Sequence, residues 1–155
     1  MEWPGPTFRD DPKVMAVGRG IVRRMLHWYA ALPPDLKAAV GGFTLLNEPA
    51  HLMPKKKDVM LGWMGDVIGD YRALVAGPNA AAGEKVPKLY VNLIETSGLH
   101  VRDMAAFMQR TFSAAELGDW AAMDLHMYLA WAHNGGASRR ATCSPHPHCS
   151  ALVYM

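Results

Sequence analysis

Three short apolar runs, each preceded by a stretch with helical periodicity, constrain the fold of this chain more than any other feature. They occupy residues 42–47, 88–95 and 120–131. Short apolar runs suit strands that are buried on both faces, as in a parallel sheet covered by helices. Because helix and strand alternate along the chain, we expect parallel strands joined by helical crossovers. The sequence therefore predicts an α/β fold.

The helical periodicity is clearest over residues 12–32. The apolar residues there recur at steps of three and four, which predicts a helix with one buried face. That face would contain Val14, Val17, Ile21, Met25, Trp28 and Tyr29. Further helices are predicted at residues 58–75 and 101–112, with a short helical turn in "LPPDLKAAVGG". Residues 76–87 are small and turn-rich, and they predict a loop.

Length and charge narrow the class of protein. A chain of 155 residues that is 50% apolar can form one domain with a sizeable core. Its net charge of +2 is small and its basic residues are scattered, so we expect no nucleic-acid partner. No run reaches the roughly 18 apolar residues of a membrane-spanning helix, and from the acids and prolines of the first residues we expect neither a signal peptide nor a membrane anchor there. We expect an N-terminal extension at residues 1–11, an α/β domain at 12–135 and a disordered tail at 136–155.

The tail contains four side chains that could ligate a soft metal, namely Cys143, His146, His148 and Cys149. Their spacing matches no standard zinc pattern, and two prolines stiffen the segment. We therefore expect no metal site here.

Polar residues gather where the apolar runs end. Glu48 follows the first run, and Pro49 pushes it toward an extended backbone rather than a helix. Glu95 ends the second run, and Asp124, His126 and Tyr128 share one face of the third by their spacing of two. Both a (β/α)₈ barrel and a doubly wound open sheet carry their chemistry at the carboxyl ends of the strands. Topology alone leaves both open.

Two of these segments bear a family resemblance. The stretch "VGGFTLLNEP" resembles the fourth-strand motif of glycoside hydrolase family 5, particularly its exo-β-1,3-glucanase branch, and "MDLHMY" adds a second match. The resemblance covers roughly residues 35–135, or about three of the eight strand–helix units of a barrel. It implies an incomplete (β/α)₈ TIM barrel.

The resemblance also implies roles for individual residues. Glu48 would be the general acid/base, Asn47 would hydrogen-bond the sugar 2-hydroxyl, and His126 and Tyr128 would line the pocket. The implied substrate is a β-glucan or another β-glucoside, cleaved with retention and without a metal or organic cofactor. Relatives of this kind are mostly secreted, but the sequence leaves the location of this chain open.

One part of the family pattern is missing. A retaining glycosidase needs a second carboxylate about 5 Å from the acid/base to attack the anomeric carbon. In the family it comes from the seventh strand, whereas residues 134–155 contain no glutamate, and Glu95 fits a rim position better than that of the nucleophile. We therefore expect a fragment of a longer glycosidase that is inactive alone. The alternative is a non-catalytic carbohydrate-binding or vestigial α/β domain.

Two further expectations concern apolar side chains. Trp120 and Trp131 could either stack on a sugar or lie in the core. An open piece of a barrel would also leave Leu45, Val91 and Ile94 only partly covered, which predicts poor solubility for the chain alone.

Overall fold

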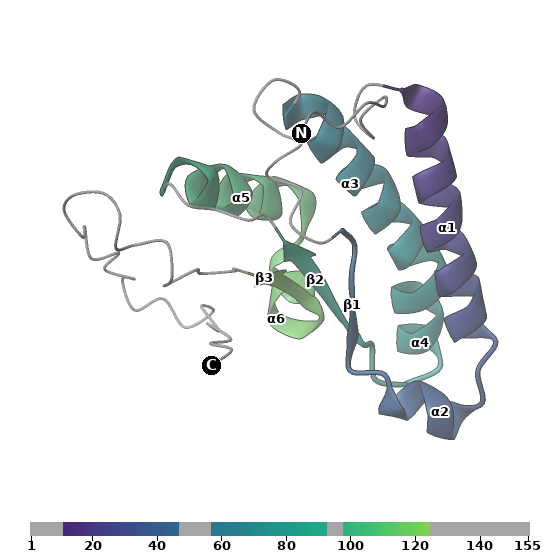
Figure 1. Ribbon diagram of the computed structural model, residues 1–155. Helices are drawn as coiled ribbons and strands as arrows, with labels where there is room; N and C mark the ends of the chain where they lie inside the picture. Colours follow the sequence, from purple (N-terminus) through teal and green to yellow (C-terminus); the bar gives the residue numbers. More distant parts are fainter. Residues whose placement is uncertain (1–10, 47–56, 93–97, 125–155) are drawn as a thin grey trace, which may run out of the picture.

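The computed structural model describes residues 11–46, 57–92 and 98–124 (Figure 1). The elements in chain order are α1 (Pro12–Ala30), α2 (Pro34–Ala39), β1 (Gly42–Thr44), α3 (Lys57–Tyr71), the π-helical turn η2 (Arg72–Ala76), α4 (Gly77–Ala81), β2 (Lys88–Asn92), α5 (Gly98–Thr111), α6 (Ala114–Asp119) and β3 (Ala121–Asp124).

The described strands form one parallel sheet in the order β1-β2-β3. Phe43 lies opposite Leu89, and Leu89 lies opposite Ala121, so these three residues form one row across the sheet. The predicted parallel pairing is therefore present among these strands. An incomplete TIM barrel goes beyond a three-stranded sheet and stays a prediction.

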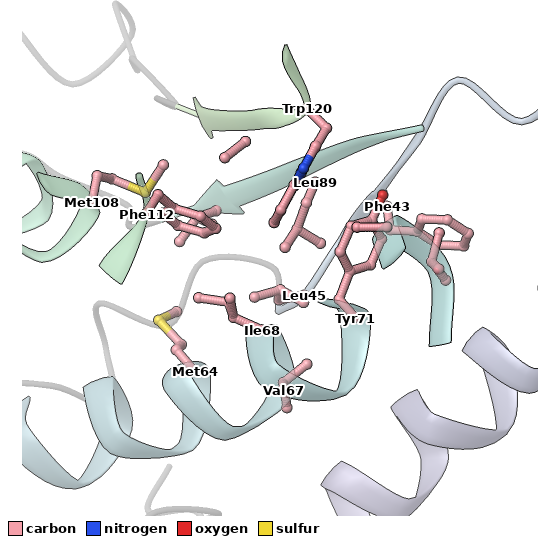
Figure 2. Packing of buried hydrophobic residues seen from close by; sticks show 14 of the residues in the cluster. Phe43, Leu45, Met64, Val67, Ile68, Tyr71, Leu89, Met108, Phe112 and Trp120 are labelled. Atoms are coloured by element: carbon pink, nitrogen blue, oxygen red, sulfur yellow. The ribbon is translucent and has the colours of Figure 1, made fainter. Parts of the chain in front are cut away.

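Both crossovers pack on the same face of this sheet. Met64 and Ile68 of α3 lie in one buried cluster with Leu89 of β2 and with Met108 of α5 (Figure 2). Since β-strand side chains alternate between faces, Thr44, Tyr90 and Ala122 point to the opposite face. That second face is less covered, because Thr44 is exposed and Tyr90 and Ala122 are half-buried.

A line of aromatic rings runs through the core. Tyr29 meets Phe43 edge-on at 5.2 Å between ring centroids, and Phe43 meets Tyr71 at 6.0 Å. Tyr71 continues to Trp120 at 5.1 Å, and Trp120 to Phe112 at 5.5 Å. These separations and tilted geometries are favourable for aromatic pairs. Trp120 is thus a core residue rather than a surface for stacking a sugar, while Trp131 lies outside the described residues.

The buried face of α1 differs from the predicted one. Leu26 and Tyr29 are buried, whereas Val17, Ile21 and Trp28 are 61%, 55% and 59% exposed. The prediction was wrong for these three residues because α1 carries two apolar stripes. Periodicity alone does not say which stripe meets the core.

Ion pairs set the rotation of α1 against α3. The carboxylate of Asp70 accepts hydrogen bonds from Arg19 Nε at 2.7 Å and from Arg23 Nη1 at 2.9 Å. A third contact joins Arg19 to Asp66 at 3.0 Å, and Trp63 Nε1 donates to the Met15 carbonyl at 3.0 Å. The arginine side of α1 therefore faces α3.

The segment after α3 contains a helix where a loop was predicted. Residues 77–81 form α4, which follows directly on the π-helical turn η2. Pro78 has no N–H, and its ring would collide with the carbonyl of Leu74 in a regular helix. The extra residue of the π-turn avoids this collision, and the N–H of Gly77 bonds to the Arg72 carbonyl instead.

Arg72 also ties this turn to α6, a helix that the sequence analysis missed. Its Nε donates to Glu116 Oε1 at 2.6 Å, and its Nη2 donates to Glu116 Oε2 at 3.0 Å. This pair lowers the pKa of Glu116 to about 2. The same glutamate completes a capping box with Ser113 at the start of α6.

Two strand predictions need correction. β1 ends at Thr44 rather than at residue 47, and Leu45 and Leu46 lie in a bend. Leu45 and Val91 were expected to be partly covered, but both are buried, while Ile94 lies outside the described residues. The exposed large apolar side chains among the described residues lie on helices instead, with Val17, Ile21 and Trp28 on α1, Leu36 on α2 and Val59 on α3.

We expect Asp70→Asn to lower the free energy of unfolding by about 2 kcal/mol at pH 7, because two arginines lose a largely buried partner. Asp66→Asn is the matched control, with an expected loss below about 0.5 kcal/mol, since Asp66 is exposed. The hydrogen bond from Arg19 lowers the pKa of Asp70. Its stabilisation is therefore complete above the unfolded value of about 3.9 and is lost as the pH falls through the lower folded value. Urea titrations at several pH values test this; equal losses in the two variants would contradict it.

A second prediction compares neighbouring glycines. A Cβ at Gly42 would lie 2.6 Å from the Tyr90 ring and would also collide with the Lys88 carbonyl, whereas a Cβ at Gly41 meets nothing within 4 Å. We expect Gly42→Ala to reduce the free energy of unfolding by about 2 kcal/mol or more and thereby to lower the melting temperature markedly. Gly41→Ala should leave it nearly unchanged. Thermal melts followed by circular dichroism measure both, and similar melts for the two variants would refute the tight packing.

Candidate functional site

The carboxyl ends of the three described strands meet at one edge of the sheet, because all three strands are parallel. Their last residues are Thr44, Asn92 and Asp124. Asn92 and Asp124 lie directly opposite each other in the strand register. In parallel α/β folds this is the edge at which ligands bind.

Asn92 is the most informative residue at this edge. It is fully buried, at 0% exposure, and its Nδ2 donates to the backbone carbonyl of Asp124 at 3.3 Å. A buried amide is costly unless it is hydrogen-bonded. The amide therefore joins the end of β2 to the end of β3.

Asn92 was not predicted as a site residue. The available signal was an amide within the otherwise apolar run "LYVNLI". A polar side chain in a buried strand needs a partner, and a strand end beside another strand end provides one.

Asp124 supplies a carboxylate to the same edge and is half-buried. By strand alternation it lies on the sheet face of Tyr90 and Asn92, opposite the main helical core. Thr44 contributes an exposed hydroxyl on that face. Within the described residues, this edge thus offers the carboxylate of Asp124 and the hydroxyl of Thr44, groups suited to hydrogen-bonding a polyhydroxylated ligand, while the buried Asn92 amide aligns the strand ends.

The residues that the sequence predicted for the site continue from these strand ends. Asn47, Glu48, His126 and Tyr128 all lie outside the described residues, as do Glu95 and the Cys143–Cys149 cluster. Along the chain, Glu48 follows Leu46 by two positions, and His126 follows Asp124 by two. Their assigned roles stay predictions.

Two hollows occur elsewhere on the described surface. One of about 180 Å³ lies at the opposite edge of the sheet, between α2 and the segment before β2; it is lined by Tyr29, Pro34, Lys37, Ala38, Val40, Glu84, Lys85 and Pro87. The other, an open groove of about 360 Å³, lies between the first turns of α1 and α3. Neither is lined by a residue at the strand ends.

Within the described ranges, a metal-ligating cluster and a membrane-spanning helix are both absent. No group of three or more His, Cys, Asp or Glu side chains is placed to hold a metal ion there. None of the helices in those ranges is both long enough and apolar enough to span a bilayer.

Comparison with protein-family models, with characterised proteins and with solved structures found no significant match to this chain.

We expect Asn92→Asp to destabilise the protein at pH 7 by about 2 kcal/mol or more, because it buries a carboxylate beside the Asp124 carbonyl. Burial would raise the folded pKa of the new carboxyl above the unfolded value of about 3.9. The penalty should therefore be full above the raised folded value and disappear as the pH falls below about 4. Thr44→Asp places a carboxylate at an exposed position on the same face and should cost little at any pH. Denaturant titrations between pH 3 and 8 distinguish the two; a pH-independent loss in Asn92→Asp would contradict this account.

Proposed function

We propose that this chain is part of a retaining glycoside hydrolase that cleaves β-glucosidic bonds, with Glu48 as its general acid/base. The observation that carries the proposal is the sequence pair "FTLLNEP" and "MDLHMY", each of which begins within a strand whose carboxyl end lies at the same edge of the sheet. Carboxylates and hydrogen-bonding groups at that edge are what glycoside cleavage requires.

The arrangement of the described residues supports this proposal in two ways. The strand order β1-β2-β3, with both crossovers on one face, suits a barrel segment, since a barrel wraps all its helices around one side of the sheet. The Asn92 amide holds the end of β3 at its last described residue, from which the chain continues toward His126 and Tyr128.

In the proposed mechanism, the Glu48 carboxyl protonates the departing glycosidic oxygen while a second carboxylate attacks the anomeric carbon. Glu48, now ionised, then takes a proton from the water that hydrolyses the glycosyl-enzyme. Asn47 would hydrogen-bond the sugar 2-hydroxyl, and His126 and Tyr128 would line the pocket. Since Asp124 is the one carboxylate at this edge among the described residues, we propose that another part of a longer protein supplies the nucleophile.

A second function follows if no nucleophile is supplied. The edge would then bind a β-glucan oligosaccharide without cleaving it, or it would be a vestige that binds nothing. Within this second case, the exposed hydroxyl of Thr44 and the half-buried carboxylate of Asp124 favour binding of a sugar over a vestige that binds nothing.

The decisive variant is Glu48→Gln in the longer protein. Hydrolysis of laminarin-type β-1,3-glucan should fall about 10²- to 10⁴-fold, because departure of a poor leaving group needs a general acid. An aryl β-glucoside with a good leaving group should lose much less in the glycosylation step. Rates of product release on both substrates measure this contrast.

Glu84→Gln is the matched control, because Glu84 lies near the opposite edge of the sheet and pairs only loosely, at 3.8 Å, with Lys37. It should keep its activity on both substrates. Undiminished glucan turnover in Glu48→Gln would remove Glu48 from the acid/base role.

Residues 1–155 alone should not hydrolyse β-glucosides. Calorimetry with a β-glucan oligosaccharide, run beside product detection, separates a binding domain from a vestige. Measurable hydrolysis by this chain would instead require a nucleophile within it, with Glu95 the first to test.

A further inference from the structure

Helix α1 carries an apolar stripe that the described structure leaves uncovered. Val17, Ile21 and Trp28 are each more than half exposed, and they recur at steps of four and seven along the helix. This is the spacing of a seam that packs against a second helix. The stripe also contains a tryptophan, a residue type that often anchors interfaces.

The stripe lies on the flank of α1 that faces away from α3. Met15 and Arg19, which contact α3, precede Val17 and Ile21 by two positions, or about 200° around the helix. Figure 1 shows α1 at the outer end of the helical layer, with α3 as its neighbour. A helix that continued this layer would therefore pack on the stripe.

The sheet is open on the same side. Among the described strands, β1 pairs only with β2, so its other edge can accept a further strand. The helical layer could therefore continue beyond α1, and the sheet beyond β1, on the same side of the structure.

Charge specifies the partner further. Helix α1 contains Lys13, Arg19, Arg23 and Arg24 but no acidic residue. Arg19 and Arg23 are neutralised by α3, whereas Lys13 and Arg24 have no ion-pair partner in the described part of the chain. Both lie beside the stripe on the exposed side of α1.

We propose that the Val17–Ile21–Trp28 stripe is the docking surface for the acidic, amphipathic helix of a further β–α unit, whose strand pairs with the free edge of β1. The inference shares with the proposed function only the assumption that the sheet has further strands. Its test uses no sugar. A second copy of α1 would bring Lys13 and Arg24 against the same cations, which disfavours self-association. Two unpaired cations are also fewer than the four to eight typical of a lipid-binding cluster.

The test uses residues 1–155 and a labelled helical peptide with Leu at stripe spacing and Glu on both flanks. Fluorescence anisotropy should show binding that is roughly tenfold weaker when Lys replaces Glu in the peptide. Ile21→Ser should weaken binding about tenfold by removing buried apolar surface. Leu36→Ser, at an exposed apolar position on α2, is the control and should bind like the wild type.

Arg24→Glu makes the test specific for charge. It should weaken binding of the Glu peptide and strengthen binding of the Lys peptide. Because Ile21 and Arg24 are exposed, circular dichroism should show unchanged folding in these variants.

Three results would overturn the inference: equal binding by Ile21→Ser and Leu36→Ser, an Ile21-dependent dimer in sedimentation experiments, or Ile21-dependent binding to phosphatidylserine vesicles without binding to the peptide. The outcome is independent of Glu48. A glycosidase assignment that fails the Glu48→Gln test would leave peptide binding unchanged, and the reverse also holds.

Discussion

The buried side chain of Tyr71 connects helix α3 to the sheet on which the other helices pack. Its ring packs between Phe43 of β1 and Trp120, which immediately precedes β3, and its hydroxyl donates to the Pro87 carbonyl just before β2. This one side chain at the end of α3 thus contacts β1 and the residues that directly precede β2 and β3, the other two described strands. Burial raises the pKa of Tyr71, so the phenol stays protonated and remains a hydrogen-bond donor. This packing therefore holds the amino ends of β2 and β3 next to each other.

The same interior explains which parts of the fold the sequence could predict. Strands β1 and β2 were expected because a short apolar run indicates a buried strand. Helix α3 was expected because its apolar residues recur with the period of a helix that has one buried face. The face of α1 was not, since two stripes of similar hydrophobicity compete and the choice depends on Asp70, which lies 51 positions after Arg19. Likewise, α4 and α6 depend on Pro78 and on the long-range pair of Arg72 with Glu116. Contacts between residues far apart in the sequence cannot be predicted from the local pattern around either residue.

The candidate site shows a similar division. Its edge follows from parallel topology, which the alternation of helix and strand already predicted. Asp124 was expected only to share a strand face with His126 and Tyr128 and was given no role in the site. Asn92 was missed because a single amide in an apolar run reads as a minor interruption until its partner across the sheet is known. The roles of Asn47, Glu48, His126 and Tyr128 rest on the family resemblance alone.

The two proposals ask for different additions to the described sheet: a second carboxylate for catalysis, and a further helix and strand beside α1 and β1. Glycoside cleavage needs a second carboxylate across the pocket, and the three described strands form no opposing wall to carry one. In our second proposal, a helix would cover the exposed stripe of α1, and a strand would pair with the edge of β1 that no described strand covers. A β–α unit added beside β1 would satisfy the second requirement and begin to satisfy the first, because each added strand tilts and curves the sheet toward closure. Under the two proposals together, apolar packing on α1 and catalysis at the strand ends would both depend on one step, the growth of the sheet beyond β1.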